Sequence, residues 1–155
     1  MNESSGTILL VEDNDDDVFA IRRALKNARI GNPLQVVTDG QRAVDYLSGA
    51  DEYGDRARYP LPFITFLDLK LPYIDGFEVL SWIRQRPALE SILVVVLTGS
   101  AESRDQERAY ALGARSYLIK PPTADSLQGI FQSLNSFWLS KASSSPVATE
   151  SKLRS

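Results

Sequence analysis

The segment ILVVVLTGS at residues 92–100 is the strongest indication of the fold in this 155-residue chain. Its first six residues are apolar without alternation, which is typical of a central strand that is buried on both faces, as in parallel sheets. The segment then ends in Thr98, Gly99 and Ser100, so polar groups begin where the apolar run stops. It therefore predicts the middle of a parallel sheet with helices on both sides.

Four further short apolar runs repeat along the chain, at residues 7–11, 34–37, 63–67 and 115–119. Segments with helical spacing of apolar residues lie between these runs and after the last one, within residues 18–28, 43–47, 77–83, 101–112 and 127–138. Thr123 is the expected N-cap of the last helix. Strands that alternate five times with helices predict a doubly wound, flavodoxin-like α/β domain with a five-stranded parallel sheet.

The composition is that of a folded domain, with 43% hydrophobic and 24% charged residues. The chain has no cysteine and no histidine, which excludes disulfides, thiolate zinc sites and catalytic pairs that contain histidine. No apolar run approaches the roughly 20 residues that span a bilayer, and residues 1–6 are polar rather than secretory. We expect a cytoplasmic protein with a flexible N-terminus (1–6), one domain (7–140) and a disordered tail (141–155).

The charge balance argues against nucleic acid as a partner. The net charge is −3, from 17 basic and 20 acidic residues. Three of the basic residues and one of the acidic residues lie in 141–155, so residues 1–140 hold 14 basic and 19 acidic residues, a net of −5. A folded body with this balance repels phosphate backbones, and we expect no broad binding to nucleic acid.

Chemically active side chains follow four of the apolar runs. Glu12 and Asp13 follow the first, Asp68 the third, Thr98 ends the fourth, and Lys120 follows the fifth. Because the carboxyl ends of parallel strands meet at one edge of a sheet, we expect these groups to converge. Crowded carboxylates need a cation, and their hard oxygens suit Mg²⁺. Asp68, between two leucines at a strand end, is then the expected nucleophile on phosphorus.

Each of these residues also has a simpler explanation when taken alone. Glu12 and Asp13 could cap the following helix, and Asp68 could be an ordinary loop acid. Thr98 could be a turn hydroxyl and Lys120 a surface lysine. Residues 15–17, all aspartate, are expected to form a solvated first helical turn without a chemical role. The coincidence of five such groups at the ends of four strands favours the active arrangement.

With these groups at its strand ends, the sequence resembles the receiver domain of two-component response regulators, over about residues 7–140. The matching stretches are ILLVEDN (8–14), FLDLKLPYIDGFEVL (66–80), VVVLTGS (94–100) and ALGARSYLIKPP (111–122). The resemblance implies that Asp68 is the phosphoacceptor. It also implies that Asp13 binds Mg²⁺ directly, Glu12 through water, and Lys70 through its backbone carbonyl.

The resemblance implies further roles around the phosphoryl group. Thr98 matches the hydroxyl that moves to it, Gly99 the amide beside that hydroxyl, and Lys120 the phosphate-binding lysine, which usually precedes a cis proline, here Pro121. Tyr117 matches the aromatic switch, although it could simply be an amphipathic residue at the sheet edge. Two positions depart from the commonest pattern, because Lys70 is basic and Ser100 is small and polar; both would flank the phosphoryl group.

The resemblance also implies a partner and an output. A sensor histidine kinase would be the phosphodonor, and the chain would be a single-domain signalling protein rather than an enzyme. The long connection at 50–62 and the ending Phe137-Trp138-Leu139 are similar to receivers that pair with bacterial phytochromes. Such relatives often dimerise through the fourth helix, fifth strand and fifth helix, where Phe137 and Trp138 could lie.

Other functions on this architecture fit less well. A receiver-fold interaction module that works without phosphorylation is the main alternative, and the intact acidic, hydroxyl and lysine positions argue against it. A flavodoxin would need a phosphate-cradling loop where this chain has five acids among residues 12–17. A haloacid-dehalogenase-type phosphatase would need an aspartate at Lys70, and a P-loop nucleotidase would need a glycine-lysine loop that the chain lacks.

Overall fold

Five strands form one parallel sheet in this structure, a computed structural model. They are β1 (Ile8–Val11), β2 (Leu34–Val37), β3 (Ile64–Leu67), β4 (Leu93–Thr98) and β5 (Ser116–Ile119), and their order across the sheet is β2-β1-β3-β4-β5. The description covers residues 6–143, with the side chains of residues 135–143 excepted. All five predicted strands are confirmed, each within about one residue of its expected ends.

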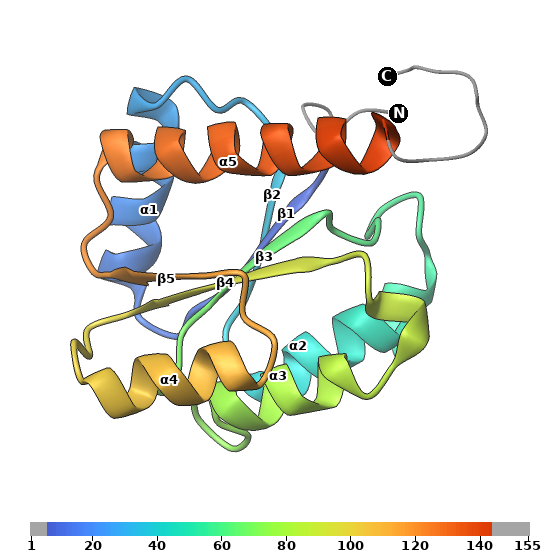
Figure 1. Ribbon diagram of the computed structural model, residues 1–155. Coiled ribbons are helices and arrows are strands. Elements are labelled where there is room, and N and C mark those ends of the chain that lie inside the picture. The colour runs from blue at the N-terminus through green and yellow to red at the C-terminus, as the bar shows by residue number, and fades with distance from the viewer. Residues whose placement is uncertain (1–5, 144–155) are drawn as a thin grey trace.

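Five helices cover the two faces of this sheet (Figure 1). They are α1 (Asp15–Asn27), α2 (Gly40–Ser48), α3 (Gly76–Arg84), α4 (Ser103–Ala111) and α5 (Ala124–Ser143). Helices α1 and α5 lie together on one face, and α2, α3 and α4 lie on the other. The doubly wound α/β fold predicted from the sequence is therefore confirmed.

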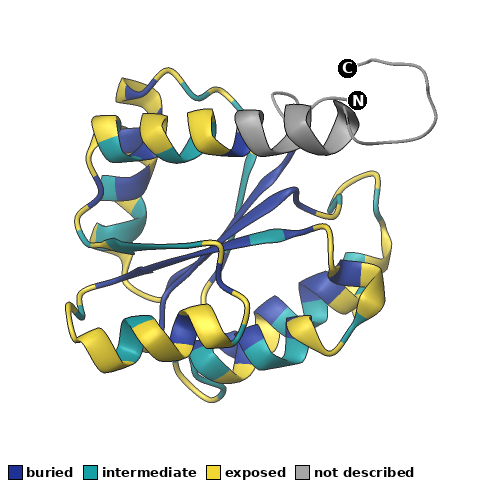
Figure 2. Ribbon diagram, viewed as in Figure 1, coloured by how far each residue is buried: buried dark blue, intermediate teal, exposed yellow. Residues whose placement is uncertain are grey.

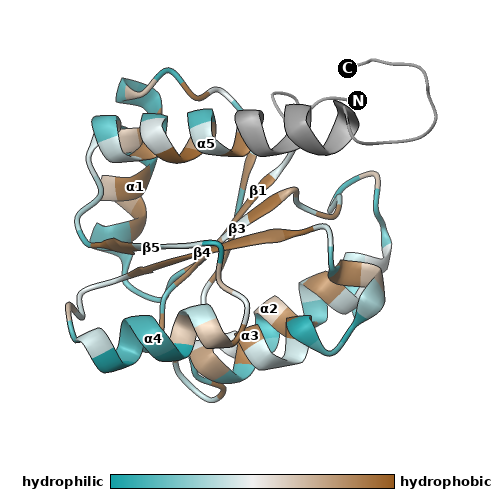
Figure 3. Ribbon diagram, viewed as in Figure 1, coloured by the Kyte–Doolittle hydropathy of each residue, from teal (hydrophilic) through white to brown (hydrophobic). Residues whose placement is uncertain are grey.

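Apolar side chains on alternating strand positions fill two cores, one on each face of the sheet. Leu9 and Val11 of β1 join the core under α2 and α3, whereas Ile8 and Leu10 join the core under α1 and α5. The inner strands are mostly dark blue in Figure 2 and mostly brown in Figure 3, because nearly all of their residues are buried and apolar. This two-sided burial explains the nearly unbroken apolar runs in the sequence.

The long connection at 50–62 is held by an arginine and an aromatic cluster. It contains a short 3₁₀ turn, η2 (Asp51–Gly54), and the Arg56 guanidinium donates to the carbonyls of Tyr46 (2.8 Å), Leu47 (3.0 Å) and Tyr59 (3.1 Å). The Tyr46 hydroxyl donates to the Pro60 carbonyl at 2.7 Å, and burial raises the pKa of Tyr46 to about 12. These contacts tie the connection to the C-terminal end of α2.

Local capping explains where the site-bearing helices begin. The Asn14 side chain accepts from the Asp17 amide at 2.9 Å and begins α1 directly after β1. The predicted cap of α5 is confirmed, because the Thr123 hydroxyl accepts from the Ser126 amide at 3.0 Å. Each cap satisfies an amide that has no partner within its helix.

The ends of the chain can be compared with the sequence only in part. Gly6, expected within the flexible N-terminus, is buried, and its carbonyl accepts from the Asn32 side chain at 2.8 Å. Helix α5 continues to Ser143, and the side chains of Phe137 and Trp138 lie outside the described residues. Within residues 6–143, no helix is both long and apolar enough to cross a membrane.

Candidate functional site

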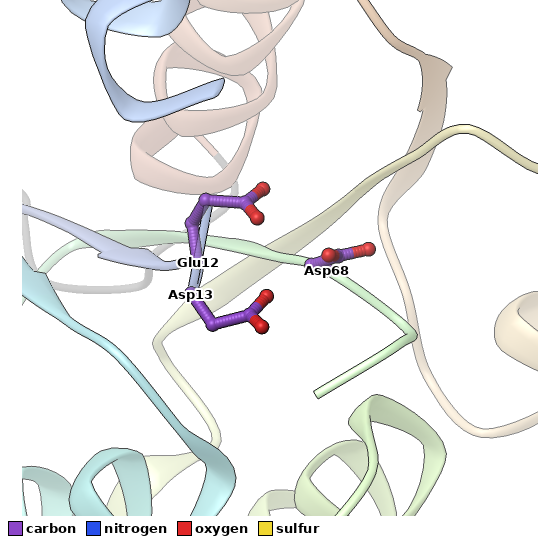
Figure 4. A group of neighbouring side chains, drawn as sticks. All are labelled: Glu12, Asp13 and Asp68. Carbon is purple, nitrogen blue, oxygen red and sulfur yellow. The ribbon is translucent and has the colours of Figure 1, made fainter. Parts of the chain in front are cut away.

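Three carboxylates meet at the carboxyl end of the sheet. One oxygen from each of Glu12, Asp13 and Asp68 lies within 4.8 Å of the others. Figure 4 shows these three side chains and the segments that carry them. Glu12 is only 1% exposed and Asp68 only 6%, whereas Asp13 is open to solvent. The cluster therefore combines two buried acids with one that faces outward.

Strand pairing brings these acids together. Val11 of β1 lies opposite Leu67 of β3, so the residues that follow both strands are neighbours although they are far apart in sequence. The Asp68 amide continues the ladder by donating to the Val11 carbonyl at 3.1 Å. The convergence that the sequence predicted follows from this register.

Lys120 compensates the negative charge of the cluster. Its ammonium lies 2.6 Å from a Glu12 oxygen, 2.8 Å from an Asp17 oxygen and 3.2 Å from an Asp68 oxygen. The backbone positions it, because the Lys120 amide donates to the Thr98 carbonyl at 2.7 Å beyond the paired ends of β4 and β5. Four segments of the chain therefore contribute to this one group of charges.

The charges change the acidity of the groups that form the cluster. Burial raises the pKa of Glu12 above its ordinary value, and the neighbouring Lys120 offsets this only in part. Burial alone would lower the pKa of Lys120, but its pairing with Asp17 and Glu12 and the charge of Asp68 raise it overall. Lys120 is therefore firmly protonated and neutralises part of the excess negative charge.

Thr98 lines the same cavity as Asp13, and the loop that follows Thr98 links it to Tyr117. Thr98 is 1% exposed at the end of β4, and the Ser100 amide points to its hydroxyl at 3.5 Å. The Tyr117 hydroxyl donates to the Ser100 carbonyl at 2.9 Å, and the Ser100 hydroxyl donates to Asp105 of α4 at 2.7 Å. The loop after β4 thus connects the site to both β5 and α4.

An open cavity of about 550 Å³ gives access to the site. Asp13, Lys70, Thr98 and Ser100 are among the residues that line it. The Lys70 side chain is exposed, and its amide donates to an Asp68 oxygen at 3.3 Å. Lys70 and Ser100 therefore both line this cavity, and their place beside the phosphoryl group stays a prediction.

Two expectations rest on backbone groups. Gly99 is exposed and follows Thr98 directly, and the role of its amide stays a prediction. The role of the Lys70 carbonyl as a metal ligand also stays a prediction. The peptide bond between Lys120 and Pro121 is cis, as the resemblance implied.

Asp17 was not among the predicted site residues. It was expected in a solvated turn without a chemical role, but its carboxylate contacts the Lys120 ammonium at 2.8 Å. Its position in the first turn of a helix that follows a strand was a signal, because such a turn borders the site. The run of three aspartates did not show which of them faces the strand ends.

The arrangement suits phosphoryl transfer. Carboxylate oxygens without nitrogen or sulfur ligands suit a hard divalent cation, which would neutralise the excess negative charge. A buried carboxylate beside that cation can act as a nucleophile, and a lysine and a hydroxyl can stabilise the charge that develops on phosphorus. The side chains for such a reaction meet at the end of this sheet.

Comparison with known families gives an independent result. The model of the response regulator receiver domain family matches residues 8–132. The probable methanogenesis regulatory protein FilR2 of Methanothrix harundinacea is 41% identical over 132 residues, which are 85% of this chain and 83% of that protein. The response regulator Rcp1 of Synechocystis sp. is 39% identical over 132 residues, covering 85% of this chain and 88% of Rcp1.

Solved structures agree with these matches. The phosphorylated cyanobacterial phytochrome response regulator RcpA has a TM-score of 0.72 and 37% identity, with 89% of this chain and 96% of RcpA covered. The Mn²⁺-bound form of Rcp1 has a TM-score of 0.69 and 39% identity, with 86% and 94% covered. The bacteriophytochrome response regulator AtBRR has a TM-score of 0.76 and 38% identity, with 86% and 95% covered.

Proposed function

The chain belongs to the response regulator receiver domain family, and on that premise we propose that Asp68 accepts a phosphoryl group from a sensor histidine kinase. The observation that carries the proposal is the meeting of Asp68 with Glu12, Asp13 and Lys120 at one end of the sheet. An Asp68 oxygen attacks phosphorus, the bond between phosphorus and the donor imidazole breaks, and the imidazole nitrogen keeps the electron pair.

The acids at the site fit a divalent cation, and we propose Mg²⁺. Glu12, Asp13, Asp68 and the Lys70 carbonyl would hold it, and all of these offer oxygen ligands. When bound, Mg²⁺ supplies positive charge that favours phosphoryl transfer to a carboxylate. The Mn²⁺-bound form of Rcp1 supports a divalent-cation site in a relative of this chain.

We propose that the remaining site residues convert phosphorylation into a change of surface. Lys120 pairs with the phosphoryl group, and the Thr98 hydroxyl and the Gly99 amide donate hydrogen bonds to it. Movement of Thr98 pulls on the loop that holds the Tyr117 hydroxyl through the Ser100 carbonyl. Tyr117 and α4 then repack, which changes the affinity of this face for a partner or for a second copy.

Intact mass spectrometry tests the proposed function. After incubation with Mg²⁺ and acetyl phosphate or phosphoramidate, the wild type is expected to gain one phosphoryl group of about 80 Da. Asp68→Asn is expected to gain none, because its amide is not a nucleophile toward phosphorus. Asp16→Asn is the matched control, since Asp16 is exposed and forms no ion pair among the described residues, and it should be phosphorylated as the wild type is.

If the phosphoryl group hydrolyses before its mass can be measured, beryllofluoride provides a second test, because it mimics the phosphoryl group and does not hydrolyse. The wild type should bind it with Mg²⁺, and Asp68→Asn should not. No mass gain together with no beryllofluoride binding would contradict the proposal. That result would favour an interaction module that works without phosphorylation. The convergence of the acids, the lysine and the hydroxyl argues against such a module.

The similar proteins support a more specific class of kinase as the phosphodonor. RcpA and AtBRR are named as phytochrome response regulators, so we propose that the donor is a bacterial phytochrome kinase in the cytoplasm. We propose that residues 7–140 are the receiver and that the chain is a signalling protein rather than an enzyme for another substrate. We also propose that the chain can dimerise through the face formed by α4, β5 and α5, and that it does not bind nucleic acid.

A further inference from the structure

Asp17 is the third carboxylate on the Lys120 ammonium, and the proposed function gives it no role. The two residues are 103 positions apart, and their 2.8 Å contact joins the first turn of α1 to the end of β5. The other two partners, Glu12 and Asp68, belong to the acidic cluster itself. Asp17 therefore contacts the site from outside that cluster.

The contact is specific to Asp17 among the three aspartates of this turn. Asp15 and Asp16 are exposed, and neither forms an ion pair in the part of the chain that the structure describes. The Asp17 amide is fixed by the Asn14 side chain at 2.9 Å, which sets where its side chain begins. The Asp17 side chain is 39% exposed, so it reaches Lys120 from the solvent side of the site.

The Lys120 ammonium is shared among three carboxylates, because it donates hydrogen bonds to Asp17 and Asp68 and forms a close ion pair with Glu12. A lysine ammonium carries three N–H groups, and carboxylate oxygens of Glu12, Asp17 and Asp68 lie within 3.2 Å of it. On phosphorylation the contact between Lys120 and the Asp68 carboxylate is replaced by contacts with the phosphoryl group, whose greater negative charge competes with Glu12 and Asp17 for the other N–H groups. Glu12 is 1% exposed and would be left buried with an unpaired charge, which is costly. The Asp17 carboxylate is partly exposed, so water can hydrate it as soon as it loses its contact with Lys120.

We propose that Asp17 is a positioning residue that holds Lys120 in the unphosphorylated state and releases it when the phosphoryl group forms. This inference rests on the proposed function, because it concerns the lysine that would bind the phosphoryl group. Asp17 competes with the phosphoryl group for the same ammonium. It therefore opposes activation and keeps the resting protein in its inactive state.

The test compares Asp17→Asn with Asp16→Asn. Both remove one negative charge from the first turn of α1, but only Asp17→Asn removes a contact with Lys120. The dissociation constant of beryllofluoride is measured with saturating Mg²⁺ by isothermal titration calorimetry. Asp17→Asn should bind about threefold more tightly than Asp16→Asn, the effect of losing one partly exposed ion pair. The difference should persist at high salt, which screens distant charges more than contacts.

A conservative variant separates this role from a structural one. Asp17→Glu keeps the carboxylate and should return the dissociation constant toward that of the wild type, whereas a general loosening of α1 would not be reversed by it. Equal affinities of Asp17→Asn and Asp16→Asn would overturn the inference, and weaker binding by Asp17→Asn would do so too. If the wild type itself does not bind beryllofluoride, the proposed function fails instead, so the two failures are distinguishable.

Discussion

Lys120→Met is expected to lower the free energy of unfolding of the metal-free protein by about 3 kcal/mol at neutral pH. The substitution removes the ammonium that faces Glu12, Asp17 and Asp68, and the Glu12 and Asp68 side chains are only 1% and 7% exposed. Breaking a buried ion pair leaves an uncompensated charge away from water, which costs more than the pair itself contributes. Urea unfolding measures the effect.

The loss should depend on pH in a definite direction. Burial raises the pKa of Glu12 in the folded protein, and Lys120 opposes this shift. A carboxyl with a raised pKa stabilises the fold at pH values below its unfolded pKa of about 4.3, and this contribution is lost as pH rises through the folded pKa. Without Lys120 the upward shift grows. The difference from the wild type should therefore widen from about pH 4.3 toward neutrality.

The matched control for Lys120→Met is Lys26→Met. Lys26 is exposed in the last turn of α1 and forms no ion pair among the described residues, so its loss should change stability by less than about 1 kcal/mol. Adding Glu12→Gln to Lys120→Met should recover part of the lost stability. Equal losses in the two lysine variants would show that Lys120 does not compensate the buried acids.

Gly76→Ala is expected to lower the free energy of unfolding by about 3 kcal/mol, at the upper end for overpacking. A Cβ at Gly76 would lie 2.6 Å from the Leu69 Cα and also meet the Asp68 carbonyl oxygen. These are backbone atoms and cannot rotate away. The Gly76 amide also donates to the Leu69 carbonyl at 2.9 Å, which holds α3 against the chain that leaves β3.

The same substitution should impair phosphorylation by acetyl phosphate, because the backbone of Asp68 must shift. Gly129→Ala is the control, since nothing lies within 4 Å of a Cβ at this helical position. Replacing a glycine inside a helix should raise stability by about 0.5–1 kcal/mol without affecting phosphorylation. Wild-type stability in Gly76→Ala would contradict the close approach of α3 to Asp68.

The fold could be predicted because the inner strands carry an unambiguous pattern. β1, β3 and β4 are buried on both faces, so almost every position is apolar, and Thr65 in β3 and Thr98 at the end of β4 are the exceptions. The site could be predicted as a group because parallel strands place their carboxyl ends at one edge. Neither inference needed the orientation of a side chain.

Features that depend on tertiary contacts could not be predicted. Residues 50–62 show no periodicity, because Arg56 and three tyrosines hold this connection rather than regular hydrogen bonding. Asp17 was not distinguished from Asp15 and Asp16, because the face that each presents depends on the cap at Asn14. The sequence position of α1 therefore does not specify which of its three consecutive aspartates contacts the lysine that follows β5.

The spread of the charged groups along the chain has a consequence for synthesis on the ribosome. Asp68 leaves the ribosome 52 residues before Lys120, and Asp17 leaves 103 residues before it. A nascent or truncated chain that lacks β5 has acids without their lysine and lacks the last strand of the sheet. The ability to accept a signal should therefore arise only when synthesis and folding of the domain are almost complete, so unfinished chains do not compete for the donor.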